Sequence, residues 1–254
     1  MKQRIFSAII CLIISIPLII YGGIYLKIGL SLMGMLAVKE ILNIKKDLPL
    51  IVNIITYILV GSLIFIDISL IVKIFIILFV LLMILIFISD KKYNIEDAFY
   101  LICFSIIILL LFSYIYLIRE KDINTLIYLF LITIFTDTFA YIGGKLFGRH
   151  KLIERISPNK TIEGFIIGSV IGTIIPTIFY IYMISPGEEF FLIILFTLLL
   201  SIIGQFGDLV FSCIKRHYKI KDFSNLIPGH GGIMDRLDSI TFVIFGYIIL
   251  INLM

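Results

Sequence analysis

The feature of this sequence that most constrains its fold is a series of apolar runs, each near 20 residues, that recurs along the whole chain. A helix needs about 20 residues, at roughly 1.5 Å per residue, to cross a hydrocarbon core about 30 Å thick. Only 15% of the residues are charged and the mean hydropathy is +1.18, whereas roughly a quarter of the residues in a soluble domain are charged. Backbone groups in lipid must be hydrogen-bonded within their own segment, so the runs are predicted to be helices. The sequence therefore predicts an all-α, polytopic integral membrane protein.

Charge clusters and turn residues divide the chain into separate spans. We expect about nine transmembrane helices, at residues 5–23, 28–44, 50–66, 69–89, 98–118, 124–146, 163–184, 189–211 and 233–253. The first span has the basic start of a signal peptide, but no small-x-small cleavage site follows, so we expect a retained helix. Ten of the 21 Lys and Arg residues lie at 145–160 or 212–238. Residues 1–122 are therefore predicted to be a transmembrane scaffold, and residues 123–254 a transmembrane catalytic region.

Five clusters of Lys and Arg indicate which loops share a side, because short cytoplasmic loops retain these residues. The clusters are Lys2 with Arg4, Lys45 with Lys46, Lys91 with Lys92, and the loops at 147–162 and 212–232. Alternation of the spans places all five on one side, and the loops with Asp67 and with Glu188 and Glu189 on the other. We expect a cytoplasmic N-terminus, a place in the cell's inner or plasma membrane, and an active site that faces the cytoplasm.

The segment 212–238, SCIKRHYKIKDFSNLIPGHGGIMDRLD, concentrates charge in an otherwise apolar chain. Its turn residues, which precede the last span, are Pro228, Gly229, Gly231 and Gly232. A glycine-rich turn that opens a helix is a natural anion site, because free amides and the helix dipole point at it. Asp235 and Asp238 follow, three residues apart, and share one helix face. The helix dipole alone stabilises such acids, but it explains neither Asp222 nor the nearby cations, and carboxylates with substrate phosphates suit Mg²⁺.

Two further acids, Asp137 and Asp208, lie inside apolar spans. Asp137 is roughly 15 Å along its helix from the cytoplasmic end, and Asp208 is less than about one turn from the end of its span. Carboxylates within a membrane are costly and usually functional. The alternative is an ion pair with Lys145 or Arg216 that only locks helices together. Both acids point to the leaflet of the basic loops, which favours a shared site.

The motif SPNKTIEG, residues 157–164, precedes the seventh span. Ser157 suits a helix cap and Pro158 the first helical position, so part of the motif is a helix start. That explanation leaves Lys160, Thr161 and Glu163 without a role. A lysine and a hydroxyl beside exposed amides can hold a phosphate, and the glutamate can orient the lysine or touch a metal.

Histidines and cysteines are few and unequal in interest. His230, flanked by glycines, is suited to face a ligand, whereas His150 and His217 lie in basic loops and are expected to be solvated. The cysteines are isolated, without CxxC spacing, and are expected to be packing residues rather than a disulfide or zinc framework: Cys11, Cys103 and Cys213.

The pattern S-x-I-K-R-x4-K-D-x-S-x2-I-P-x-H-G-G-I-x-D-R-L-D, from Ser212 to Asp238, resembles the signature of the phosphatidate cytidylyltransferases, also called CDP-diacylglycerol synthases. The blocks DTFAYIGGKLFGRHKL and SPNKTIEG resemble two other conserved blocks of that family, so the resemblance runs from Asp137 to the C-terminus. The N-terminal half is similar only in hydropathy. One departure is Ile162, where the family often carries tryptophan, which puts an aromatic contact in doubt.

The resemblance implies transfer of CMP from CTP to phosphatidate, giving CDP-diacylglycerol and pyrophosphate in phospholipid biosynthesis, with Mg²⁺ required and a second cation left open. The implied metal ligands are Asp208, Asp222, Asp235 and Asp238, with Asp137 completing the site. The implied phosphate-binding groups are Lys160, Thr161, Lys215, Arg216, Lys221, Arg236 and the turn Gly229, Gly231 and Gly232. His230 would meet the leaving group. CTP would come from the cytoplasm, and the lipid would enter sideways from the bilayer.

Two other functions fit parts of the pattern. A CTP-dependent polyprenol or phytol kinase would transfer the γ-phosphoryl group and need a base to activate a hydroxyl. A secondary transporter also holds acids within the membrane, but its site lies near the midplane at inverted repeats, whereas these charges gather at one interface. We expect no nucleic-acid partner and leave a homodimer open.

Overall fold

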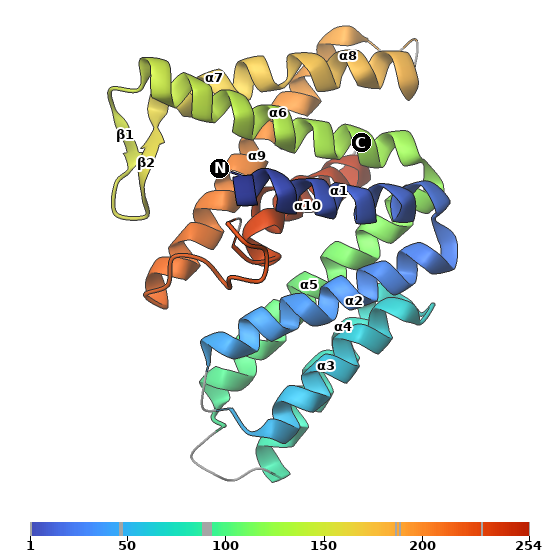
Figure 1. The fold of residues 1–254 in the computed structure, drawn as a ribbon. Coiled ribbons are helices and arrows are strands. Elements are labelled where there is room, and N and C mark those ends of the chain that lie inside the picture. The colour runs from blue at the N-terminus through green and yellow to red at the C-terminus, as the bar shows by residue number, and fades with distance from the viewer. Residues whose placement is uncertain are drawn as a thin grey trace. The chain divides into compact units, whose positions relative to one another are not determined.

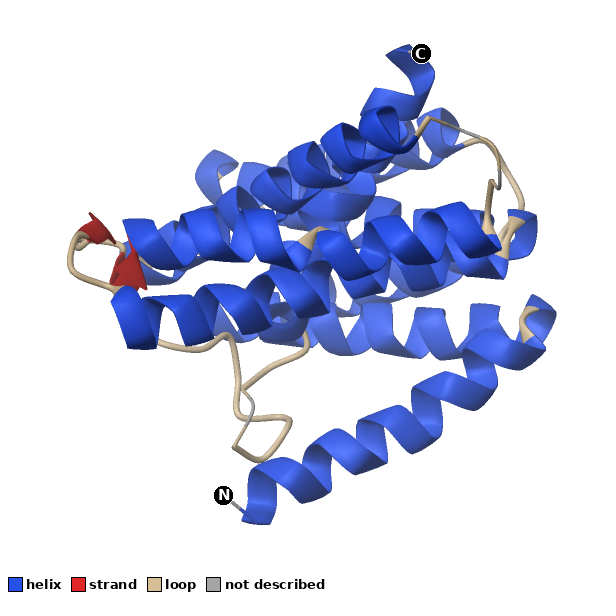
Figure 2. Ribbon diagram, turned by 90° about the horizontal axis from the view of Figure 1, so that it is seen from above, coloured by secondary structure: helices blue, strands red, loops and turns tan. Residues whose placement is uncertain are grey.

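Helices make up nearly all of the computed structural model, which describes residues 2–45, 48–87, 93–185, 187, 189–229 and 231–253 (Figure 1). The helices are α1 (Lys2–Tyr21), α2 (Gly23–Ile44), α3 (Leu50–Phe65), α4 (Leu70–Phe87), α5 (Ile95–Lys121), α6 (Ile123–Phe147), α7 (Ile162–Gly172), α8 (Ile174–Met183), α9 (Phe190–His217) and α10 (Met234–Leu253). Two short strands, β1 (Lys151–Ile153) and β2 (Ser157–Thr161), form a small hairpin, red in Figure 2. The predicted all-α fold is confirmed, and each predicted span coincides with a helix or, for 163–184, with α7 and α8.

Length and composition identify the helices that can cross a membrane. Within the described parts of the chain, five segments are long and apolar enough: Ile95–Lys121, Ile123–Phe147, Ile162–Met183, Phe190–His217 and Met234–Leu253. Shorter apolar helices lie at Ile9–Tyr21, Leu50–Phe65 and Leu70–Leu85. The number of crossings and the cytoplasmic N-terminus stay predictions. Four residues of the charge pattern behind the orientation lie outside the described residues: Lys46, Lys91, Lys92 and Glu188.

Helix α9 is longer than the sequence predicted. It ends at His217 instead of residue 211, because its last turn carries Lys215, Arg216 and His217, and cations are favourable at a helix C-terminus. Lys219 then adopts a left-handed conformation with φ 55°, which turns the chain out of the helix. The predicted distance of Asp208 from the end of its helix was therefore too short: Asp208 lies nine residues before His217, the last residue of α9, about 14 Å at 1.5 Å per residue.

The chain forms two compact units, Met1–Glu120 with Asp222–Met234, and Lys121–Lys221 with Asp235–Met254. In the first unit α2 packs against α3, and the Ser31 hydroxyl donates to the Gly61 carbonyl at 2.7 Å. The Tyr100 hydroxyl of α5 donates to the Ile41 carbonyl of α2 at 3.0 Å. The second contact lies in the C-terminal half of α2, the part of the helix that carries Glu40.

In the second unit a stripe of glycines on α7 fits against α6, and Figure 1 shows α6 running alongside α7 and α8. The stripe is Gly164, Gly168 and Gly172. A Cβ on Gly168 would lie 2.6 Å from the Ala140 Cβ, and one on Gly172 would lie 2.7 Å from the Thr136 Cα. Small residues at four-residue spacing allow this approach in membranes. The close packing fixes α6, and with it Asp137.

Helix α9 carries a row of buried hydrogen bonds to its neighbours in the second unit. The hydroxyls of Thr197 and Tyr128 lie 2.7 Å apart, and those of Ser201 and Thr136 lie 2.8 Å apart. One turn on, the Gln205 amide donates to the Ser169 hydroxyl at 2.7 Å. Asp208 follows on the next turn of the same helix, so this ladder sets its height and rotation.

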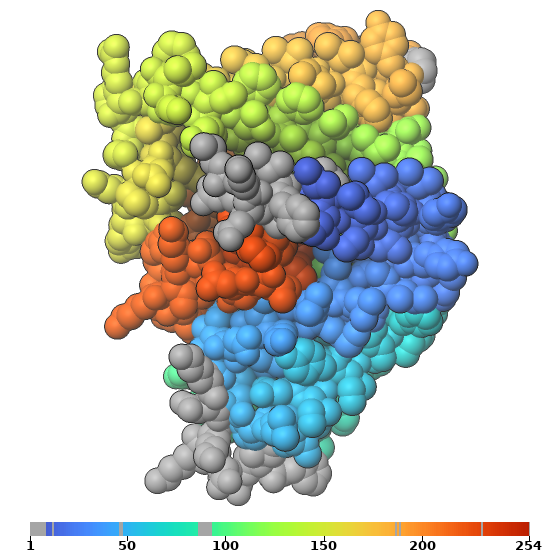
Figure 3. Space-filling view, viewed as in Figure 1, coloured from blue at the N-terminus to red at the C-terminus, as the bar shows by residue number. Residues whose placement is uncertain are grey.

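The hairpin corrects the predicted start of the seventh span. Ser157 and Pro158 belong to β2, which pairs antiparallel with β1, so they are not a helix cap and first turn. Thr161 is the cap, and its hydroxyl accepts a hydrogen bond from the Gly164 amide at 3.1 Å. The hairpin, yellow in the space-filling view, lies beside the C-terminal end of α6 (Figure 3).

Candidate active site

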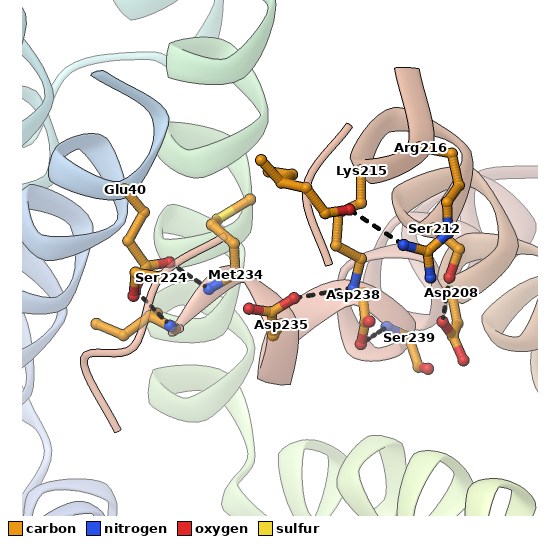
Figure 4. A network of polar contacts seen from close by, with 12 residues as sticks. Glu40, Asp208, Ser212, Lys215, Arg216, Ser224, Met234, Asp235, Asp238 and Ser239 are labelled. Carbon is orange, nitrogen blue, oxygen red and sulfur yellow. Dashed lines mark hydrogen bonds and ion pairs between the residues drawn. The ribbon is translucent and has the colours of Figure 1, made fainter. Parts of the chain in front are cut away.

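Two helices of the second unit, α9 and α10, place a buried ion pair at the start of α10. The Lys215 ammonium lies 2.8 Å from the Asp235 carboxylate, and the two side chains are 10% and 3% exposed (Figure 4). Asp235 falls in the first turn of α10, as predicted, because the helix begins at Met234. A proposed metal ligand and a proposed phosphate-binding lysine are therefore each other's partners.

A second ion pair joins the hairpin to α9. The Lys160 ammonium of β2 lies 2.5 Å from the Asp208 carboxylate, and the side chains are 29% and 27% exposed. The Ser212 hydroxyl, one turn along α9, also donates to Asp208 at 3.3 Å. The alternative partner that the sequence suggested, Arg216, donates instead to the carbonyls of Ile156 at 3.2 Å and Ile220 at 3.1 Å.

Three carboxylates from three helices interact within the second unit. Asp137 of α6 and Asp238 of α10 both lie near enough to Asp208 of α9 for their charges to repel one another. Lys160 and Arg236 attract Asp137, while Lys215 attracts Asp238. Counted along the helices, Asp137 lies ten residues before the end of α6 and Asp208 nine before the end of α9, which corresponds to about 15 Å and 14 Å. These three acids therefore interact electrostatically, and the shared site stays a prediction.

Glu163 has a different arrangement from the one its motif suggested. Its carboxylate accepts from the backbone amides of Arg149 and His150, at 3.1 and 3.2 Å, and lies 2.6 Å from the His150 ring nitrogen. These contacts hold the chain where it leaves α6 and enters β1. The His150 side chain is 75% exposed, as expected for a residue in a basic loop. Glu163 therefore anchors the hairpin that presents Lys160.

The glycine-rich turn groups with the first unit. Gly229 and Gly231 have φ of 77° and 85°, a left-handed backbone that requires glycine. The Ile227 amide closes the turn on the Gly231 carbonyl at 2.8 Å. Asp222 also belongs to this unit, whereas Lys221 ends a segment of the other, and both are exposed. His230 lies outside the described residues.

Sequence reasoning missed Glu40, a buried carboxylate of α2 that contacts the glycine-rich turn. It accepts from the amides of Ile233 and Met234 and from the Ser224 hydroxyl, all within 2.9 Å (Figure 4). The signal was present, because Glu40 is an acid inside an apolar span, the feature that singled out Asp137 and Asp208.

The donor chemistry of the second unit fits a hard divalent cation. Among the residues that the structure describes, no three His, Cys, Asp or Glu side chains form a group that could hold a metal ion. Mg²⁺ does not need such a cage, since it keeps several waters and is usually bound through one or two carboxylates plus substrate phosphates. Asp208 and Asp238 are carboxylates of that kind. Lys160 lies beside Asp208, and the charge of Lys215 attracts Asp238.

The long apolar helices define a helical membrane protein, and its second unit pairs carboxylates with lysines. The sequence matches the model of the cytidylyltransferase family over residues 2–254. The chain belongs to this family and is a nucleotidyltransferase, which confirms the resemblance found in the sequence and extends it through the N-terminal half.

Three relatives are phosphatidate cytidylyltransferases of staphylococci. The protein of Staphylococcus haemolyticus (strain JCSC1435) is 37% identical over 260 residues. Those of Staphylococcus saprophyticus subsp. saprophyticus (strain ATCC 15305) and Staphylococcus aureus (strain COL) are each 35% identical, over 254 and 260 residues. Each similarity covers 96% of this chain and 96% of the relative.

Proposed function

We propose that the protein is a CTP:phosphatidate cytidylyltransferase, which forms CDP-diacylglycerol and pyrophosphate. The observation that carries the proposal is the similarity over 96% of both chains to relatives of that name. The pairing of lysines with carboxylates in the second unit supports it. The reaction must bring together two phosphate groups that repel each other, and such a site supplies both the cations and the metal ligands that this requires.

In the proposed reaction an oxygen of the phosphatidate phosphate attacks the α-phosphorus of CTP. The new P–O bond forms while the bond from the α-phosphorus to the β-bridging oxygen breaks, and pyrophosphate leaves with the electron pair. The attacking phosphate is already an anion at neutral pH, so the site needs no strong general base. Its work is to position the phosphates and to neutralise their charge.

The ion pairs can exchange partners when substrates bind. Lys160 and Lys215 would turn from Asp208 and Asp235 to the substrate phosphates, which leaves the two carboxylates available as metal ligands. A bound Mg²⁺ would neutralise charge on the triphosphate and on the departing pyrophosphate. Asp208 and Asp238 are the proposed principal ligands, and Asp137 would orient them. Asp222 and Asp235 remain proposed ligands, with a second cation left open.

The remaining site residues complete the substrate contacts. Arg216, Lys221 and Arg236 are exposed cations and would hold the triphosphate. The turn at Gly229 and Gly231, with His230, is proposed to approach the leaving group. Thr161 caps α7 and would place the adjacent Lys160. CTP would enter from the cytoplasm and phosphatidate from the inner leaflet of the cell membrane, which agrees with the basic loops predicted on that side.

The test is a reaction of purified protein with phosphatidate, Mg²⁺ and CTP labelled at the α-phosphorus, beside a reaction labelled at the γ-phosphorus. We expect α-label in extracted lipid and release of pyrophosphate, both lost on chelation of the metal. Label from the γ-phosphorus in lipid would instead indicate a lipid kinase. Absence of label from either position would contradict the proposed substrates.

A further inference from the structure

Glu40 lies in the middle of the hydrogen bonds that join α2 to the loop before α10. Glu40 is buried, with only 2% of the residue exposed. One carboxylate oxygen accepts from the Ser224 hydroxyl and the Ile233 amide, both at 2.7 Å, and the other accepts from the Met234 amide at 2.9 Å. These residues and Glu40 belong to the same compact unit.

The two amides are those of the N-terminus of α10, which begins at Met234. The first amides of a helix have no acceptor within the helix, and the dipole there favours an anion. Hydrogen bonds from amides to a carboxylate are also stronger than those between neutral groups. The anion at this helix start is therefore supplied by α2, some 190 residues earlier in the chain.

Gly232 is shaped for this contact. A Cβ on Gly232 would lie 2.5 Å from both carboxylate oxygens of Glu40. Unlike Gly229 and Gly231, Gly232 does not have a left-handed backbone. Glycine is therefore required here because a side chain would have no space, and not because of its backbone conformation. The close approach that the sequence predicted for a phosphate is made here by a carboxylate of the chain.

We propose that Glu40 is a positioning residue for the cytidylyl-transfer site. It fixes the first turn of α10, and Asp235 and Asp238 follow Met234 by one and four residues on that helix. Because the helix is rigid over one turn, the direction of both carboxylates depends on how its first residues are held. This inference rests on the proposed function, since it gives Glu40 a role in orienting two of the proposed metal ligands along α10.

The first test is Glu40→Gln, which keeps the shape of the side chain but turns one acceptor into a donor that faces the loop. Residues that orient metal ligands typically cost 10–100-fold in metal affinity or activity when mutated. We expect kcat to fall by about that factor and the Mg²⁺ concentration for half-maximal activity to rise several-fold. The matched control is Glu96→Gln, on an exposed glutamate of the same unit, which should leave both values unchanged.

A second test uses the space beside Gly232. Gly232→Ala alone should reduce kcat about tenfold or more because its methyl group meets the carboxylate. In the double variant Glu40→Ala with Gly232→Ala the methyl group has room, so the glycine substitution should have little further effect on the Glu40→Ala protein. If each substitution instead reduced kcat by its own factor, and the two factors multiplied in the double variant, the contact between Glu40 and Gly232 would be contradicted. The comparison also works if Glu40→Gln folds poorly.

A third readout does not depend on catalysis. Amide hydrogen exchange of a peptide that covers residues 222–234 should be faster in Glu40→Gln than in Glu96→Gln. Unchanged exchange would overturn the contact, and faster exchange with unchanged kcat and Mg²⁺ dependence would overturn the positioning role. If wild-type protein gave no α-label in lipid, the proposed function would fail by itself, while the exchange result would still report on Glu40.

Discussion

Glu40 of the first compact unit and two aspartates of the second, Asp208 and Asp235, are held in opposite ways. In the first, Glu40 accepts hydrogen bonds from two backbone amides and a hydroxyl. In the second, Asp208 and Asp235 each lie against the ammonium group of a lysine. Backbone amides cannot leave without unfolding the helix start, whereas a lysine on its long side chain can turn to another anion. The first arrangement fastens the chain, and the second is the one that we propose exchanges partners when substrates bind.

The largest effect on turnover should come from substitution of Asp208, one of the two carboxylates that we propose exchange their lysine partners. Asp208→Asn keeps the side-chain volume but removes the charge that interacts with Asp137, Asp238 and Lys160. Loss of metal-centred charge stabilisation is worth several kcal/mol, so we expect turnover to fall by about 10³-fold or more. The α-label assay measures this loss.

The control for Asp208→Asn is Glu154→Gln, on an exposed glutamate between the hairpin strands. It should retain full turnover. Because the Asp208 side chain is 27% exposed, the thermal stability of Asp208→Asn in detergent should stay close to that of wild type. Substantial remaining turnover in this variant would contradict a central role for Asp208.

The Lys215–Asp235 pair tests whether substitution of a lysine-paired carboxylate also lowers the stability of the protein. Asp235→Asn leaves Lys215 buried without its carboxylate, and removal of one partner of a buried pair typically costs about 3–5 kcal/mol. We expect a clear fall in the midpoint of thermal unfolding in detergent, together with lost turnover.

The double variant Asp235→Asn with Lys215→Met removes the lysine charge as well. Its unfolding midpoint should recover toward that of wild type, while turnover stays low. If the single variant were as stable as wild type, the pair would have no structural importance, and the contrast between the two carboxylate classes would lose one of its examples.

A smaller effect is expected for the other carboxylate held by amides. Glu163→Gln removes an acceptor of the Arg149 and His150 amides, and with it the anchor of the hairpin that presents Lys160. Turnover should fall only a few-fold, and KM for CTP should rise, because Lys160 is still present. Limited proteolysis between residues 150 and 161 should become faster. A loss as large as that of Asp208→Asn would place Glu163 among the exchangeable carboxylates.

The sequence could predict what depends on local pattern. Hydropathy placed a helix at every predicted span, and the roles of the two acids within apolar helices, Asp137 and Asp208, stay predictions. The strand at Ser157–Thr161 could not be foreseen from its own residues, because it exists through pairing with Lys151–Ile153. The contact of Glu40 with Ile233 spans 193 residues and has no local signature. The glycine stripe of α7 was readable at four-residue spacing, and so was the isolated acid of α2.

The hydrogen-bond ladder of α9 limits how this helix can move during a reaction. Thr197, Ser201 and Gln205 each bond to a different neighbouring residue, so sliding of the helix by a single residue would break all three bonds together. The next comparable register lies a full turn away, about 5.4 Å, too coarse a step for adjusting a metal ligand. If Asp208 contacts the substrates as proposed, it must therefore adjust to them by rotation about its own side-chain bonds while the backbone of α9 stays in place.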